Sequence, residues 1–248
     1  MQSLLFAIVC LIFCLFPSFA TAKQTLNMAV LGNSVSQGTD SIGWGVYPEY
    51  NWASGTKIRS HLVKLEEQRD VKVIAKNVSI VGAHSNLLGF ELERLGKDFI
   101  PDYATIEIGA NDVCMAIGDV KNNFLHNVKS AIEKLIDMNP NVEIIVTPIA
   151  RLSSMTKVRN SMGCKVVWDI ACPSILGSLL TEEQRQHRQA MIDDINVSTK
   201  ALVSTYPQVH FNITLGTLDI PDDYISTVDC FHPSVIGQQA FSDLTFDE

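Results

Sequence analysis

Short apolar segments alternate along the chain with segments whose apolar residues have helical spacing. The apolar segments predict strands, because each is short and most are rich in Val, Ile and Leu. The expected strands are Leu26–Leu31, Val71–Ile80, Ala104–Ile108, Glu143–Pro148 and Val209–Ile213. Strict alternation of strand and helix requires right-handed crossovers, which place helices on both faces of a parallel sheet. We therefore expect a three-layer, doubly wound α/β fold with a parallel sheet of about five strands.

The segments between the expected strands carry helix signals. Ile58, Leu62 and Leu65 fall on one helical face. Thr181 and Gln184 have the spacing of a capping box that opens a long helix. A further helical face is formed by Phe124, Val128, Ala131, Ile132 and Leu135.

The first 22 residues carry no charged side chain and end in Ala20-Thr21-Ala22, a small-x-small cleavage pattern. We expect a secretory signal peptide over residues 1–22 and a single domain over residues 23–248. An uncleaved membrane anchor is the alternative, and Pro17 together with the cleavage pattern argues against it. The protein is then secreted or periplasmic, with no stable membrane span after cleavage.

The formal net charge is -8, and no cluster of Lys and Arg interrupts this acidic balance. Nucleic acids and anionic membrane surfaces attract basic proteins, so we expect no nucleic-acid partner. The sequence leaves the oligomeric state open.

Candidate site residues follow the expected strands. Ser34 lies in LGNSVSQG after the first strand, Gly82 in SIVGAHSN after the second, and Asn111 in IGANDVC after the third. Asp229 and His232 lie together in VDCFHPS near the C-terminus. In an open parallel sheet, ligands bind outside the carboxyl ends of the strands. Each segment alone could be an ordinary turn or helix cap, but together they predict one site at this edge of the sheet.

These residue types suit acyl transfer, which needs a nucleophile, a base, a group that orients the base, and donors for the oxyanion. Ser34 is the expected nucleophile, His232 the base, and Asp229 the group that orients His232. The backbone N–H groups of Ser34 and Gly82 and the side-chain amide of Asn111 are the expected oxyanion hole. A protein that uses the same cleft only for binding is the alternative.

The ordered set of Ser34, Gly82, Asn111 and His232, with Asp229 three residues before the histidine, resembles the SGNH (GDSL-type) hydrolases. The family is named for these four residue types in chain order, and the resemblance spans nearly the whole chain after residue 22. It implies a flavodoxin-like sheet, a Ser-His-Asp triad, no metal or cofactor, and hydrolysis of a small-molecule or lipid ester.

Asn33 departs from the family, which usually has Asp before the nucleophile. We expect activity to survive, since Asp229 serves the histidine and a neutral amide keeps similar hydrogen bonds. No G-x-S-x-G motif occurs in the chain, which argues against an α/β-hydrolase.

GANDVC, followed by Cys164, Trp168 and Cys172-Pro173, resembles the phospholipase B-like and acyloxyacyl hydrolase-like branch of the family. This resemblance favours a lipid ester as substrate. A carbohydrate acetyl esterase is the alternative.

Four cysteines follow the signal peptide, and an even number in an exported chain predicts two disulfides. The spacings do not fit a zinc site. If the loops of Cys114 and Cys230 both line the site, these two cysteines pair with each other. Cys164 and Cys172 would then close a short loop within residues 151–180, which show no clear period.

Aromatic residues cluster after the nucleophile, at Trp44, Tyr47, Tyr50 and Trp52. They either line the site against an acyl chain or a sugar ring, or pack their loop onto the sheet. Arg151 follows the fourth strand and either contacts an anionic head group or, as we favour, pairs with an acidic neighbour.

Overall fold

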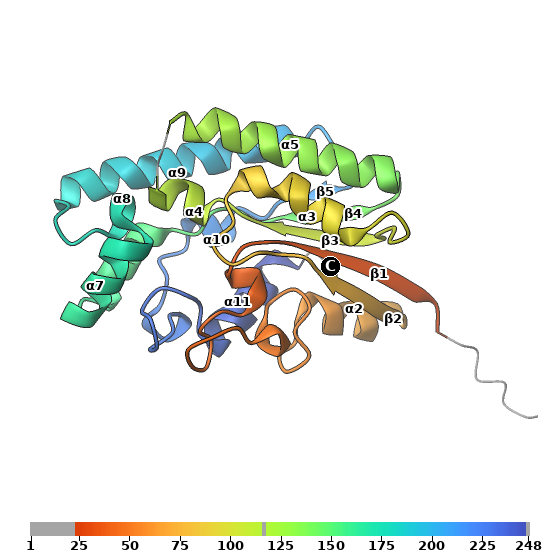
Figure 1. Cartoon of the computed structure of the whole chain (residues 1–248), viewed down its shortest axis with the longest axis horizontal. Helices are drawn as coiled ribbons and strands as arrows, with labels where there is room; N and C mark the ends of the chain where they lie inside the picture. The colour runs from red at the N-terminus through yellow and green to blue at the C-terminus, as the bar shows by residue number, and fades with distance from the viewer. Residues whose placement is uncertain (1–22, 116–117, 247–248) are drawn as a thin grey trace, which may run out of the picture.

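Five parallel strands form one sheet in the order β2-β1-β3-β4-β5 (Figure 1). The structure, a computed structural model, describes residues 23–115 and 118–246, so the expected signal peptide lies outside the described residues. The strands are β1 Thr25–Gly32, β2 Lys72–Asn77, β3 Tyr103–Glu107, β4 Glu143–Val146 and β5 Val209–His210. The strand order reverses beside β1, which confirms the expected doubly wound α/β fold.

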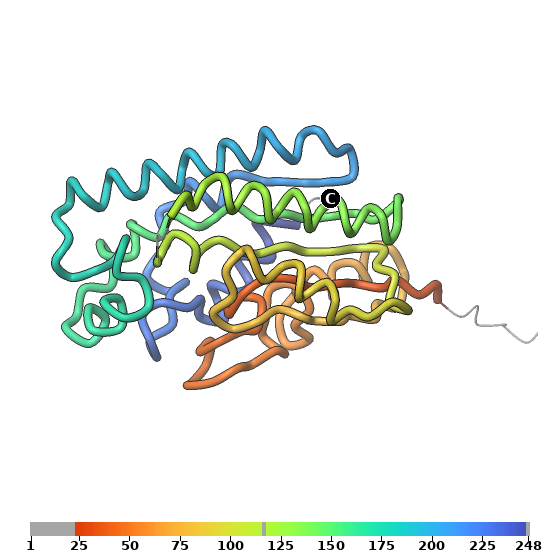
Figure 2. The backbone as a smooth tube through the Cα atoms, turned by 45° about the horizontal axis from the view of Figure 1, so that its top comes forward, coloured from red at the N-terminus to blue at the C-terminus, as the bar shows by residue number. Residues whose placement is uncertain are grey.

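Helices cover both faces of the sheet. α3, α5 and α9 lie on one face and α2 and α11 on the other (Figure 1), and the two longest helices, α5 and α9, run side by side (Figure 2). In residues 23–115 and 118–246, no helix combines the length and apolar character needed to cross a membrane. The α-helices are α2 His61–Arg69, α3 Leu88–Leu95, α4 Ala110–Met115, α5 Val120–Met138, α6 Met155–Val158, α7 Met162–Ala171, α8 Pro173–Leu176, α9 Glu182–Val203, α10 Thr214–Thr217 and α11 Val235–Thr245. Short 3₁₀ helices are η1 Val35–Gln37, η2 Pro48–Tyr50, η3 Ser85–Leu87, η4 Leu152–Ser154 and η5 Asp222–Tyr224.

The interior strand β1 is apolar from Met28 to Leu31, where both of its faces are covered. Ala29 and Leu31 belong to the core shared with α3, α5 and α9, whereas Met28 and Val30 belong to the core shared with α2 and α11. All four side chains are fully buried. Two-sided burial explains why this strand shows a continuous apolar run rather than alternation.

The capping box expected at Thr181 is present at the start of α9. The Thr181 hydroxyl accepts the Gln184 N–H at 3.2 Å, and the Gln184 side chain accepts the Thr181 N–H at 2.9 Å. The predicted apolar face of α5 is also buried, as its spacing required.

The expected disulfide pairing is wrong. The structure joins Cys114 to Cys172 and Cys164 to Cys230. Residues 151–180 are not an irregular loop: they contain η4, α6, α7 and α8. Cys164 lies in α7 and Cys172 caps its C-terminus, so the two are eight steps apart along the helix, about 12 Å at 1.5 Å per step. A disulfide needs Cα atoms within about 7 Å, so each cysteine takes a partner from another element.

Candidate active site

A tight turn at the end of β1 presents Ser34. The preceding Gly32 has a φ of +146°, and a Cβ at this position would lie 2.2 Å from the carbonyl oxygen of Glu107. Only glycine permits this close approach of β1 and β3. Ser34 then caps η1, and its side chain emerges beyond the carboxyl end of the strand, where the sequence placed the nucleophile.

Ser34, His232 and Asp229 are brought together although 198 residues separate the serine from the histidine. The Ser34 Oγ lies 2.8 Å from His232 Nε2, and Nδ1 of the same ring contacts Asp229 Oδ2. With the proton of the neutral imidazole on Nδ1, Nε2 is free to accept from the serine hydroxyl. This is the hydrogen-bond chain that a serine nucleophile requires.

Asp229 is held as a carboxylate. Burial disfavours its ionised form, but the hydrogen bond and charge of the His232 ring, together with two backbone hydrogen bonds, outweigh burial and keep the pKa of Asp229 below its usual range. Its Oδ1 also accepts the backbone N–H groups of Phe231 at 3.0 Å and His232 at 3.1 Å. An ionised, fixed carboxylate is the form that orients an imidazole.

The expected oxyanion donors come from adjacent loops. Asn111 donates from Nδ2 to the carbonyl oxygen of Ala83 at 2.8 Å, which ties the loop after β2 to the start of α4. Gly82 precedes Ala83 and has a φ of +79°, in the left-handed region. A Cβ at Gly82 would meet nothing within 4 Å, so the backbone conformation, rather than lack of space, favours glycine here.

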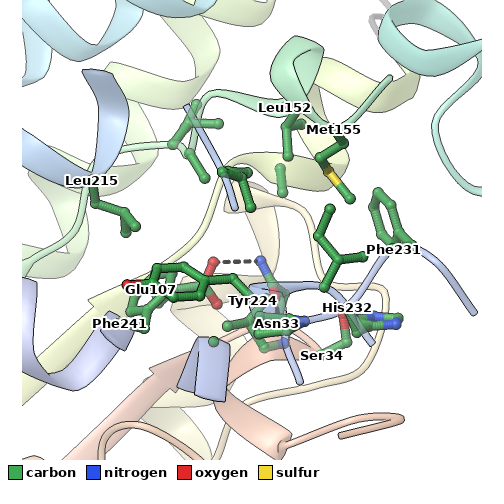
Figure 3. A pocket seen from close by; sticks show the side chains of 18 of the residues that line it. Asn33, Ser34, Glu107, Leu152, Met155, Leu215, Tyr224, Phe231, His232 and Phe241 are labelled. Carbon is green, nitrogen blue, oxygen red and sulfur yellow. Dashed lines mark hydrogen bonds between the residues drawn. The ribbon is translucent and has the colours of Figure 1, made fainter. Parts of the chain in front are cut away.

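Asn33 is held against a buried carboxyl group that the sequence analysis missed. Its Nδ2 donates to Glu107 Oε1 at 3.1 Å (Figure 3), and its Oδ1 accepts the Val35 N–H at 2.9 Å. Burial raises the pKa of Glu107 to about 7, against the opposing effect of the hydrogen bonds from Asn33 and Ser36. A charged residue near the end of the mostly apolar ATIEI segment is the signal that could have found it.

A second buried carboxyl group, Glu91 on α3, lies beneath the same turn. Its Oε2 accepts the Gly32 N–H at 2.8 Å. Burial is the main reason that the pKa of Glu91 is raised to about 8, and the charge of Glu107 adds to it. The turn that presents Ser34 therefore rests on two carboxyl groups whose pKa values burial raises toward the neutral range.

A largely apolar pocket opens directly over the nucleophile (Figure 3). Ser34 and His232 lie on one side of it, and Leu152 and Met155 face them from the other. The apolar part of the lining comes from the loops and helices after β4 and β5 and from the C-terminal segment. Its members include Ile149, Leu152, Met155, Leu215, Leu218, Ile220, Ile225, Phe231 and Phe241.

The four aromatic residues after the nucleophile are not among the described residues that line this pocket. Trp52 is fully buried and donates from Nε1 to the Ser36 hydroxyl at 3.2 Å, so it packs the loop onto the sheet. Trp44 is 72% exposed, and the hydroxyl of Tyr47 donates to the Trp44 carbonyl oxygen at 3.1 Å. Tyr50 carries the ammonium of Lys57 over its ring. Of the two alternatives left open by the sequence, the contacts of Trp52 therefore support packing of the loop, and a substrate contact of the other three rings stays a prediction.

Arg151 also lies outside the pocket lining of the described residues. Its Nε is 3.2 Å from Asp219 Oδ1, so it forms the ion pair with an acidic neighbour that the sequence analysis favoured. The head-group contact proposed for it from the sequence therefore has no geometric support.

One set of three potential metal-ligand side chains occurs among the described residues: Asp40, Asp229 and His232, with ligand atoms within 4.8 Å of one another. His232 Nδ1 already contacts Asp229, and Nε2 faces Ser34. The donor set therefore suits a hydrogen-bonded histidine better than a bound metal ion.

The chain matches the model of the GDSL-like lipase/acylhydrolase family over residues 30–240. This match covers most of the chain, so the protein belongs to that family and is a carboxylic ester hydrolase of the SGNH/GDSL type. The resemblance found in the sequence is thereby confirmed at the level of the family. Comparison with curated proteins gave no significant match.

Three solved structures illustrate the shared fold. The lipase Lip_vut3 from a goat rumen metagenome is 16% identical, with a TM-score of 0.60 over 88% of this chain and 94% of that one. The psychrotrophic esterase EstA from Pseudoalteromonas sp. is 18% identical, with a TM-score of 0.51 over 88% and 92%. A catalytic mutant of Axe2, an acetylxylan esterase from Geobacillus stearothermophilus, is 15% identical, with a TM-score of 0.54 over 90% and 93%. At these identities the likeness concerns the fold alone.

Proposed function

We propose that the protein is an exported serine esterase that cleaves lipid acyl esters with Ser34 as nucleophile. The observation that carries this proposal is the chain of contacts from Ser34 through His232 to Asp229 at the floor of an apolar pocket.

In the acylation step, Ser34 Oγ attacks the ester carbonyl while His232 Nε2 takes the hydroxyl proton. The oxyanion is held by the N–H groups of Ser34 and Gly82 and by the amide of Asn111. His232 returns the proton to the leaving alcohol, and an acyl-enzyme remains. Water then attacks the acyl-enzyme with its proton passing to His232. His232 gives that proton to Ser34 Oγ as the carboxylic acid leaves, which restores the serine hydroxyl.

The pocket lining supports an aliphatic acyl chain as the bound part of the substrate. Most of its walls are aliphatic and aromatic side chains, and its polar side chains are those of Asn33, Ser34, Glu107, Asn111, Tyr224 and His232. Burial of each methylene in such a pocket stabilises the complex by about 0.8 kcal/mol. A sugar ring would leave its hydroxyl groups without partners along these walls, which costs binding free energy.

Export through the segment 1–22 is part of the same proposal. It is supported by the two disulfides, because such bonds persist in oxidising compartments such as the periplasm and the extracellular space.

The first experiment is covalent labelling of the mature protein with a fluorophosphonate, with the adduct located by peptide mass spectrometry. We expect labelling at Ser34 that is lost in Ser34→Ala. The matched control is Ser204→Ala at the C-terminal end of α9, far from the turn after β1, and it should label like the native protein. A folded native protein that does not label would overturn the serine mechanism and favour the binding-protein alternative.

The substrate class is tested with p-nitrophenyl esters of increasing acyl length, phospholipids and acetylated sugars. We expect kcat/KM to rise from acetate to medium-chain esters, by up to about fourfold for each methylene that the pocket buries. A preference for acetylated sugars over every acyl chain would overturn the lipid substrate and leave the serine mechanism intact.

A further inference from the structure

His232 has a second carboxylate beside it. The Oδ2 of Asp40 lies 3.7 Å from His232 Nδ1, the same ring nitrogen that contacts Asp229. Asp40 is 8% exposed, so solvent screens this charge only weakly. The distance is too long for a hydrogen bond but short for two charged groups.

Asp40 is fixed in this position by its own loop. Its φ is +54°, a left-handed conformation that Asp tolerates better than most residues. Its Oδ1 accepts the Gly45 N–H at 2.7 Å, and its backbone N–H donates to the Gly45 carbonyl oxygen at 2.7 Å. These bonds leave Oδ2 as the carboxylate oxygen nearest the imidazole.

Ser226 links the loop that contains Asp40 to the loop that contains His232. The Ser226 hydroxyl donates to the Asp40 carbonyl oxygen at 2.6 Å, and the Ser226 N–H donates to the His232 carbonyl oxygen at 2.8 Å. Ser226 thus contacts both loops, whereas the Asp40 carboxylate itself is held by the Gly45 N–H.

We propose that Asp40 is a second carboxylate for His232, a positioning residue that stabilises the imidazolium during catalysis and partly replaces Asp229 when that residue is removed. This inference rests on the proposed serine mechanism. In each acyl-transfer step the proton from Ser34 or water makes His232 a cation, and two flanking carboxylates stabilise that cation more than one does. The carboxyl groups facing His232 are Asp229, Asp40 and Glu107.

The test is Asp40→Asn, which keeps an oxygen for the Gly45 N–H and tolerates the left-handed backbone. Loss of one flanking charge makes protonated His232 less stable. We expect kcat to fall about tenfold and the acid limb of the kcat/KM profile to move about one unit to lower pH, because one pKa unit corresponds to a factor of ten. A purely structural role would lower kcat without moving the acid limb.

Two variants separate charge from loop geometry. Ser226→Ala removes the tie to the Asp40 carbonyl oxygen but keeps the carboxylate, so the acid limb should stay in place. Asp70→Asn makes the same chemical change at another left-handed aspartate, with a φ of +49°, that caps α2 on the exposed surface. It should leave kcat and the pH profile unchanged.

A double-mutant comparison tests whether Asp40 partly takes over the role of Asp229. Asp40→Asn should reduce activity by a larger factor in an Asp229→Ala background than in the native protein, because Asp40 is then the only flanking carboxylate on Nδ1. Equal factors in both backgrounds, or an acid limb that does not move in Asp40→Asn, would overturn the inference while Ser34 still labels. If the native protein does not label, the serine mechanism fails first and this inference falls with it.

Discussion

At the scale of single residues, the turn that presents Ser34 depends on pairing a neutral amide with a buried carboxyl group. Asn33 donates to Glu107, whose other oxygen lies 3.4 Å from the Ser36 hydroxyl. Glu107 is 5% exposed, so this pair is poorly solvated. Asn in place of the usual family Asp therefore suits its neighbour: two carboxyl groups at this distance cannot both ionise.

Asn33→Asp should destabilise the protein above neutral pH, because the introduced carboxyl group and Glu107 would then share one proton. We expect the free energy of unfolding at pH 8, measured with urea, to fall by about 1–3 kcal/mol. Asn33→Asp combined with Glu107→Gln should recover most of that loss, since the glutamine amide can donate to the introduced carboxylate. Equal stability of Asn33→Asp and the native protein at pH 8 would show that the pair is not coupled.

At the scale of elements, the disulfides connect α4, α7 and the histidine loop around the pocket. Cys230 stands between Asp229 and His232 and has a φ of +58°. Besides its bond to Cys164 in α7, its carbonyl oxygen accepts the Trp168 Nε1–H at 2.8 Å. Helix α7 thus anchors the loop that carries the acid and the base.

Replacing Cys164 and Cys230 together by Ser should lower both stability and activity. We expect a loss of about 2–4 kcal/mol in the free energy of unfolding and a lower kcat, because the loop with His232 gains freedom. The matched control replaces Cys114 and Cys172, since the two bonds span similar separations of 66 and 58 residues. A larger loss of kcat in the Cys114 and Cys172 variant would contradict this assignment.

At the scale of the whole molecule, buried ionisable groups make stability depend on pH. The pKa values of Glu91 and Glu107 are raised by burial from 4.5 to about 8 and about 7. Between pH 4.5 and about pH 8, these two carboxyl groups bind more protons in the folded state than in the unfolded state. Their contribution to the free energy of unfolding therefore falls as pH rises. His61 has the opposite effect around and below its ordinary pKa of 6.5. Burial lowers its pKa, so the unfolded state binds a proton that the folded state excludes, and the free energy of unfolding rises with pH there.

The free energy of unfolding should therefore decrease from about pH 7.5 to about pH 8.5, a range in which His61 of the unfolded chain is mostly neutral and Glu91 still titrates. Glu91→Gln cannot ionise, so its free energy of unfolding should fall less over this range. Urea unfolding at several pH values measures both slopes. A native stability that is constant or rising over this range would contradict the assigned direction.

Much of the fold and site was predictable because their signals are local. Strand and helix periods appear within ten to twenty residues, and the rule that strand ends meet at one edge brought Ser34 and Asn111 into one site. Contacts between side chains of different helices, strands and loops had no such local signal. The pairing of Cys164 depended on a helix, α7, that the sequence analysis read as irregular, and the burial of Trp52 depended on the packing of α11.

The sequence by itself determined the α/β class, the family, and the ordered set of candidate catalytic residues, because these follow from periodicity and from short motifs in chain order. Only the tertiary structure decided which cysteines pair, which side chains line the pocket, and that Glu107 lies beneath Ser34 and Asp40 beside His232. Those relations are distances between segments far apart in the chain. They are set by how helices and loops pack on the sheet, which the local pattern of residues does not encode.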